Sequence, residues 1–119
     1  MTIKQLRRAM EHFQLILDMH EWHLTVHYVP QIDLALRYGN PAYALYGCCD
    51  IDLANHKADI SINRPCDMKK LDQRPNVMLT TLLHEMGHVL FDPNSTLAGD
   101  TNFELALDRF ASCVVALHG

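Results

Sequence analysis

The sequence lacks the features that mark several large classes of protein. No apolar run approaches the ~18 residues that a membrane-spanning helix needs, and the opening MTIKQLRRAMEHF holds no apolar stretch of signal-peptide length. The 10 lysine and arginine residues stand against 14 acidic residues, and no basic run exceeds two residues. This pattern gives no electrostatic footprint for nucleic acid or for an anionic membrane. We therefore expect a cytoplasmic protein that binds neither.

Cysteine is also scarce, with four residues and no CxxC spacing for a structural zinc ribbon. Cys48 and Cys49 are adjacent, and adjacent cysteines rarely pair, so we expect reduced thiols that act as small buried hydrophobes. At 119 residues and 49% hydrophobic, the chain is long enough for one core and too short for a second, separate module. A single domain over 1–119 follows.

Hydrophobic periodicity predicts the order helix, three strands, helix, helix. The predicted ranges are 3–19 for the first helix, 22–29, 43–53 and 56–63 for the strands, and 75–91 and about 103–117 for the last helices. The last two strands are close enough for a hairpin around Ala54 and Asn55. Strands followed by helices are typical of an α+β domain with helices on one face of a sheet, here mostly antiparallel with three to four strands.

The stretch LLHEMGHVLF, residues 82 to 91, places two histidines four positions apart within an apolar run. On a helix, His84 and His88 lie one turn apart on one face, where both can bind one metal ion. Glu85 beside them can take a proton from metal-bound water, as in HExxH zinc hydrolases. An ordinary histidine-rich helix is the alternative, but unpaired buried polar groups cost on the order of 2 to 7 kcal/mol each. The motif therefore predicts a catalytic Zn²⁺ site.

A catalytic zinc ion needs a third protein ligand. Asn94 stands where the extended motif has a third histidine, so the ligand must come from further along the chain. Glu104 and Asp108 lie one turn apart on the final predicted helix. We expect Glu104 to bind the metal and Asp108 to orient a histidine ring, with the reversed roles, or His118, as alternatives. Glu104 also fits a capping box that begins at Thr101, which would give it a purely structural role.

HEMGH, followed on the next predicted helix by ELALDRFA (104–111), resembles the gluzincin arrangement of HExxH and then ExxxD. The match is closest to the small ImmA/IrrE-like metallopeptidases, many of which are carried by phages, and it covers roughly residues 77–117. Leu107 and Asp108 replace the Ala-Asn pair of that family, and we expect no DNA-binding module of the kind that many members carry. SprT-like proteases are a weaker resemblance, because they require a third histidine and none occurs between 89 and 117.

The resemblance implies a minimal zincin fold and a zinc-dependent metallopeptidase, phage-encoded and acting inside the host cell. His84, His88 and Glu104 would bind Zn²⁺, and Glu85 would act as the general base. Two other functions stay open. One is a zincin-fold module that binds or regulates a protein partner and whose metal is structural or vestigial. The other is a metal-dependent hydrolase of a non-peptide substrate.

The resemblance also implies where a protein or peptide substrate would bind. In zincins the substrate lies extended along an edge strand, and the strand over 57–63 is the candidate. A further donor stabilises the oxyanion in such enzymes, and Tyr43, Tyr46 and His56 are unranked candidates.

Overall fold

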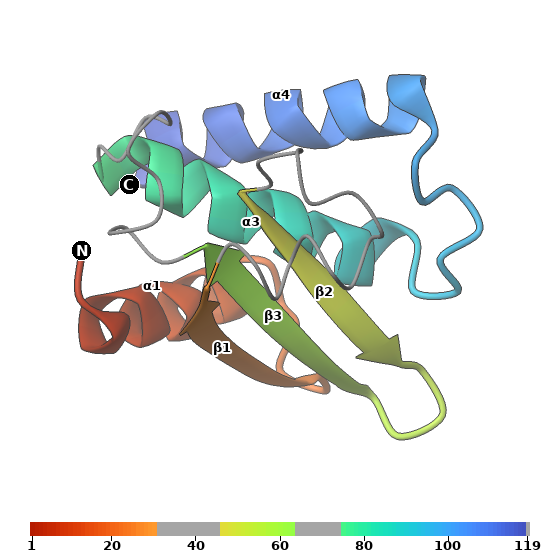
Figure 1. The fold of residues 1–119 in the computed structure, drawn as a ribbon, viewed down its shortest axis with the longest axis horizontal. Coiled ribbons are helices and arrows are strands. Elements are labelled where there is room, and N and C mark those ends of the chain that lie inside the picture. Colours follow the sequence, from red (N-terminus) through yellow and green to blue (C-terminus); the bar gives the residue numbers. More distant parts are fainter. Residues whose placement is uncertain (31–45, 64–74, 119) are drawn as a thin grey trace.

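The computed structural model of the chain describes residues 1–30, 46–63 and 75–118. In chain order its elements are α1 (Ile3–Ile16), β1 (His23–Val29), β2 (Gly47–Asp52), β3 (Lys57–Asn63), α3 (Pro75–Phe91) and α4 (Thr101–His118) (Figure 1). The predicted order of one helix, three strands and two helices is confirmed over these ranges. Residues 43–45, where the second strand was expected to begin, lie outside the described residues.

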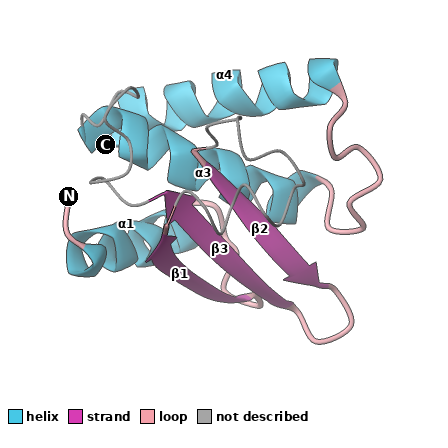
Figure 2. Ribbon diagram, in the orientation of Figure 1, coloured by secondary structure: helices cyan, strands magenta, loops and turns pink. Residues whose placement is uncertain are grey.

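The molecule is layered, with α1 and α3 on one face of the sheet and α4 packed against α3 (Figure 2). Alternation along the strands directs apolar side chains toward these helices, and the stripe on α1 meets them. The α+β class with helices on one face is thereby confirmed. The core formed in this way includes Leu6, Met10 and Phe13 of α1, Leu24 and Val26 of β1, Ala58, Ile60 and Ile62 of β3, and Leu82, Leu83 and Met86 of α3.

The sheet has the strand order β1-β3-β2. The β2–β3 pair is the predicted antiparallel hairpin, but β1 pairs with β3 in parallel, so the sheet is mixed and the expectation of a mostly antiparallel sheet is wrong. The expectation that 57–63 forms a free edge is also wrong. Because β3 is the central strand, its backbone groups pair with neighbours on both sides. Among the described residues, β2 is the outer strand on the side of α3.

Local hydrogen bonds fix both ends of α1. Thr2 and Gln5 form a capping box at the start of the helix. The helix ends at Ile16, three residues before the predicted end, because Asp18 adopts a φ of 54° that a helix cannot continue. The Gln14 side-chain amide then donates to the carbonyl oxygens of Met19, at 3.1 Å, and Trp22, at 2.6 Å. These two bonds hold the turn that leads into β1.

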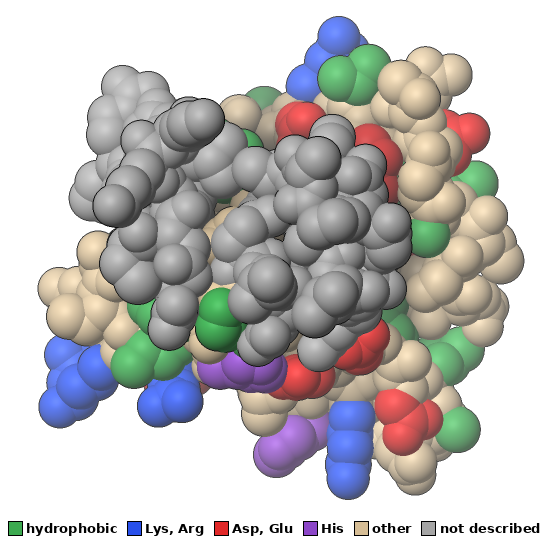
Figure 3. All heavy atoms as spheres, viewed as in Figure 1, with side chains coloured by type: hydrophobic (Ala, Val, Ile, Leu, Met, Phe, Trp, Pro, Cys, Tyr) green, Lys and Arg blue, Asp and Glu red, His purple; other side chains and the backbone are tan. Residues whose placement is uncertain are grey.

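The described surface shows no concentration of basic charge on the face seen in Figure 3. Its lysine and arginine side chains stand in separate groups at the margin, and the histidines gather near the lower edge, next to acidic side chains. Within the described ranges, no helix is both long enough and apolar enough to cross a membrane.

Candidate metal centre

Helix α3 positions the predicted motif. Pro75 occupies its first turn, where a missing N–H costs nothing, and the helix continues as far as Phe91, as predicted. His84 and His88 lie one turn apart, with ring centroids 5.1 Å from each other. Within the described residues, one group of three potential metal ligands has its donor atoms within 4.8 Å of one another: His84, Glu85 and His88. The structure therefore brings together the three motif residues singled out from the sequence.

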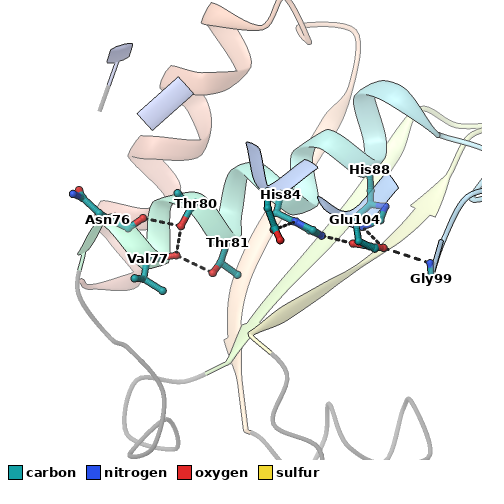
Figure 4. Close-up of polar contacts among 9 residues, drawn as sticks. Asn76, Val77, Thr80, Thr81, His84, His88, Gly99 and Glu104 are labelled. Carbon is teal, nitrogen blue, oxygen red and sulfur yellow. Dashed lines mark hydrogen bonds and ion pairs between the residues drawn. The ribbon is translucent and has the colours of Figure 1, made fainter. Parts of the chain in front are cut away.

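Glu104 of α4 lies between the two histidines (Figure 4). Its Oε2 atom is 2.6 Å from Nε2 of His84, and its Oε1 atom is 3.3 Å from Nε2 of His88. Glu85 is also close to both rings, but Glu104 is the carboxylate that directly contacts an Nε2 atom of each. Donor atoms from both helices thus lie beside one another, with one Glu104 oxygen at each histidine ring.

Asp108 holds His84 from the other side of the ring. Its Oδ1 atom is 2.7 Å from Nδ1 of His84, and its side chain is 65% exposed. A carboxylate at this position fixes the orientation of the imidazole and leaves Nε2 directed at Glu104. The reversed assignment, with Asp108 as the ligand, is disfavoured because Asp108 meets only the Nδ1 atom, on the far side of the ring from the cluster.

The capping explanation for Glu104 does not describe this helix. The N-terminus of α4 is capped by Asp100, whose Oδ1 accepts a hydrogen bond from the backbone N–H of Phe103 at 2.9 Å. Glu104 therefore lies one position beyond the residue that completes a capping box. Among the described residues, Glu104 contacts the helix start through the backbone N–H of Gly99, whose nitrogen is a long 3.4 Å from Oε1. The carboxylate is thus free of a strong capping role.

Gly87 permits the close approach of α3 and α4. A Cβ atom at this position would lie 2.7 Å from Cδ2 of Leu107 and 3.4 Å from the ring of Phe110. Leu107 follows Glu104 by three residues and precedes Asp108, so the same helix face carries the apolar contact and both carboxylates. Sequence reasoning missed this glycine. The signal was available, because an isolated glycine inside a helical pattern usually has a packing reason.

Asp92 organises the connection between α3 and α4. Its side chain is buried and accepts hydrogen bonds from the hydroxyl and the backbone N–H of Thr96, at 2.8 and 3.1 Å, and from the N–H of Leu97, at 2.8 Å. Burial alone raises the pKa of Asp92, but these bonds and nearby His88 outweigh it and leave the pKa lowered. The loop that leads into α4 is therefore tied to the first residue after α3.

The cluster lines a cleft of about 960 Å³ between β2, α3 and α4. Tyr46 lines this cleft, whereas His56 stacks on Trp22 with ring centroids 5.1 Å apart and is not among the described lining residues. Tyr43 lies outside the described residues. The other described lining residues include Gly47, Cys49 and Ile51 of β2, Val77, Thr80 and Thr81 of α3, and Ser95, Ala98 and Gly99 of the loop between α3 and α4.

The protonation of the site is set mainly by burial. Burial lowers the pKa of His88, and nearby His84 acts in the same direction against the opposing effect of Glu104, so the neutral, metal-binding imidazole is favoured. Glu85 is 6% exposed, and burial raises its pKa to about 7, while His84 and a hydrogen bond with Cys49 act against this rise. A carboxyl group with a pKa near neutrality can both accept and release a proton.

Cys49 is a residue of the site that the sequence did not reveal. Burial raises the pKa of its thiol, and the charge of Glu85 and the hydrogen bond to it add to the rise. A thiol with a raised pKa stays protonated and can donate to the Glu85 carboxylate. The prediction of small, buried cysteines describes Cys48, which is 5% exposed, better than Cys49. None of the three described cysteines is in a disulfide.

Comparison with known proteins assigns no family. No family model matches the chain, and neither a curated protein nor a solved structure is significantly similar to it. The chemistry of the site is therefore argued from its own geometry.

Proposed function

We propose that the chain is a zinc-dependent metallopeptidase with a minimal zincin-like fold, in which His84, His88 and Glu104 hold the metal ion. The observation that carries this proposal is the position of Glu104, whose two oxygens reach the Nε2 atoms of both histidines. A carboxylate placed in this way joins the two helices at the point where the donor atoms converge.

The donor set suits zinc in type and in spacing. Two imidazole nitrogens and one carboxylate oxygen are the ligands of a common class of catalytic zinc site. Zinc–ligand bonds of roughly 2.0 to 2.1 Å in a tetrahedron place neighbouring donor atoms about 3.3 Å apart. The separation of 3.3 Å between Glu104 Oε1 and Nε2 of His88 equals this value, whereas the 2.6 Å between Glu104 Oε2 and Nε2 of His84 is that of a hydrogen bond. Asp108 supplies the carboxylate partner that a metal-bound histidine usually has.

The remaining residues supply acid–base chemistry. Zinc held by His84, His88 and Glu104 would supply a water molecule with a lowered pKa and would polarise a carbonyl group. Glu85 lies within 4.8 Å of the histidine donor atoms, near enough to accept the proton of a water molecule held there. With its pKa raised to about 7, the same carboxyl group can return that proton to the leaving amine.

The alternative of a structural metal explains less of the site. Structural zinc sites are mostly built from four cysteine and histidine ligands, whereas His84 and His88 are here joined by carboxylates. Such a site also has no use for a buried carboxylate beside the ligands, and burying Glu85 costs free energy. A binding or regulatory module therefore leaves Glu85 without a role.

Metal content is the first test. Protein purified without chelators should contain about one zinc per chain by inductively coupled plasma mass spectrometry. His88→Ala and Glu104→Ala should each lose it, and Glu11→Ala, at an exposed acidic residue on α1, should retain it. A folded wild type that neither contains nor takes up zinc would remove the basis of the proposal.

Hydrolysis is the second test. A proteome-derived peptide library incubated with the zinc-loaded protein should yield new peptide termini by mass spectrometry. Glu85→Gln should retain zinc and lose cleavage by at least about a hundredfold, since general bases contribute 10²-fold or more. Cleavage that persists undiminished in Glu85→Gln would contradict the assignment of the base. Zinc binding without peptide cleavage would favour a non-peptide substrate or a structural metal.

A further inference from the structure

Every second residue of strand β2 and every fourth residue of helix α3 recur at similar spacings along the cleft. Two residues along a strand advance about 6.6 Å, and four residues along a helix advance about 6.0 Å. Gly47 lies opposite Thr81, because a Cβ atom on Gly47 would be 3.3 Å from Cγ2 of Thr81. Two residues further on, the same pitch places Cys49 opposite Glu85, which is four residues after Thr81 and lines the same cleft. The row of β2 side chains that faces α3 thus places the thiol at the general base.

The β2–β3 register shows independently that Cys49 faces this side of the sheet. Cys49 is the direct partner of Ile60, which is completely buried in the core between sheet and helices. Cross-strand partners share a face, so the Cys49 side chain is on the α3 side, and it packs against that core. Both Cys49 and Glu85 line the cleft.

We propose that Cys49 is a positioning residue whose thiol donates a hydrogen bond to Glu85 and holds the carboxylate beside the histidine pair. The proposal rests on the function proposed above. Glu85 is buried, and a glutamate side chain has three rotatable bonds, so its orientation requires a partner. Cys49 can supply that bond from the sheet, whereas every proposed metal ligand belongs to α3 or α4.

The bond itself can be observed by infrared spectroscopy of the S–H stretch, which moves to lower frequency when the thiol donates to a carboxylate. Wild type should show a shifted band that disappears in Cys49→Val and moves again in Glu85→Gln, because an amide oxygen is a weaker acceptor. Cys113→Ala, at an exposed cysteine of α4 outside the cleft, should retain the shifted band. Valine removes the donor, is about one methyl group larger than cysteine and suits a strand, and circular dichroism verifies that the variant is folded.

The role of the bond is measured by kinetics with the zinc-loaded protein and the best peptide from the library. Cys49→Val should lower kcat about tenfold with KM unchanged, as expected for the loss of one bond to a charged group. Cys49→Ser retains a donor and should recover part of the loss. Zinc affinity should stay within about twofold of wild type in both variants, because Cys49 contacts no proposed ligand. If Cys49→Val does not fold, Cys49→Ala is used in its place.

The outcomes are distinct. A shifted band together with a fall in kcat that serine partly restores supports the proposal. The absence of a shifted band in wild type, or full kcat in folded Cys49→Val, overturns it. If wild type cleaves nothing, the proposed function has failed and the positioning role fails with it, while the band still decides whether the thiol–carboxylate bond exists.

Discussion

Replacing Gly87 with alanine perturbs the site without touching a proposed ligand. The new methyl group would lie 2.7 Å from Cδ2 of Leu107, about 0.8 Å short of the ~3.5 Å of an ordinary carbon–carbon contact. Leu107 is 1% exposed, so its side chain has little room to turn aside. We expect part of the shortfall to be met by a shift of α4 away from α3, which moves Glu104 away from the histidines.

The effects on stability and on metal binding differ in size. Alanine improves helix propensity by about 1 kcal/mol, whereas overpacking costs about 1 to 3 kcal/mol, so the free energy of unfolding should fall by at most about 2 kcal/mol. Metal sites tolerate ligand displacements of only about 0.2 Å. A displacement of several tenths of an ångström at Glu104 should therefore weaken zinc binding about ten- to a hundredfold, the range found for disturbed supporting contacts.

The measurement is zinc competition against a chromophoric chelator, with thermal unfolding of the metal-free protein alongside. The double variant Gly87→Ala/Leu107→Ala makes room for the added methyl group and should recover most of the lost zinc affinity, despite its own loss of core packing. A double-mutant cycle then gives the coupling between the two positions. Zinc affinity in Gly87→Ala within twofold of wild type would show that Leu107 absorbs the methyl group and that α4 does not move.

Three further outcomes are expected. Glu104→Gln should weaken zinc binding in the same competition assay more than Asp108→Asn does, since one change removes a ligand charge and the other a ring contact; equal losses would reopen the reversed assignment. Asp92→Asn should lower the melting temperature at neutral pH, because the amide presents a donor where Leu97 N–H needs an acceptor. Because the pKa of Asp92 is lowered, this residue stabilises the fold above its unfolded pKa of about 3.9, and the stabilisation is lost as the pH falls through the folded pKa. Asp92→Asn should therefore lose less stability than wild type on acidification below about pH 4. Acid unfolding curves of equal shape for the two proteins, followed by circular dichroism, would contradict this.

The elements of the fold followed from local patterns. The α3 helix begins at Pro75 and ends at Phe91 as its periodicity and flanking prolines predict, and the hairpin of β2 and β3 forms where two alternating runs come close. Strand order did not follow, because pairing of β1 with β3 depends on contacts across 34 residues of chain. The position of β3 as the central strand, which excludes it as an edge for substrate, belongs to that long-range information.

In the site, too, contacts within the α3–α4 pair could be predicted from the sequence, whereas contacts with the sheet could not. The placement of Glu104 and Asp108 against the histidines could be anticipated, because two antiparallel helices with ligand types at one-turn spacing have few ways to meet. The capping box at Thr101 could not be rejected from the sequence, since Asp100 beside it is an equally good cap. The contact of Cys49 with Glu85 depends on which face of β2 meets α3, and a glycine-containing strand gives a weak indication of that face.

The hydrogen-bonded cluster around His84 lies within a short piece of chain, and this has a consequence for how the protein folds. His84 and Asp108 are 24 residues apart, and both lie in the helical hairpin of α3 and α4. Contacts of short sequence separation form early, so this hairpin can gather its ligands before the sheet has docked. Cys49 reaches Glu85 only afterwards. On the proposed function, a nascent chain that had captured zinc would still have its base unrestrained in water, and full activity would require the sheet to dock.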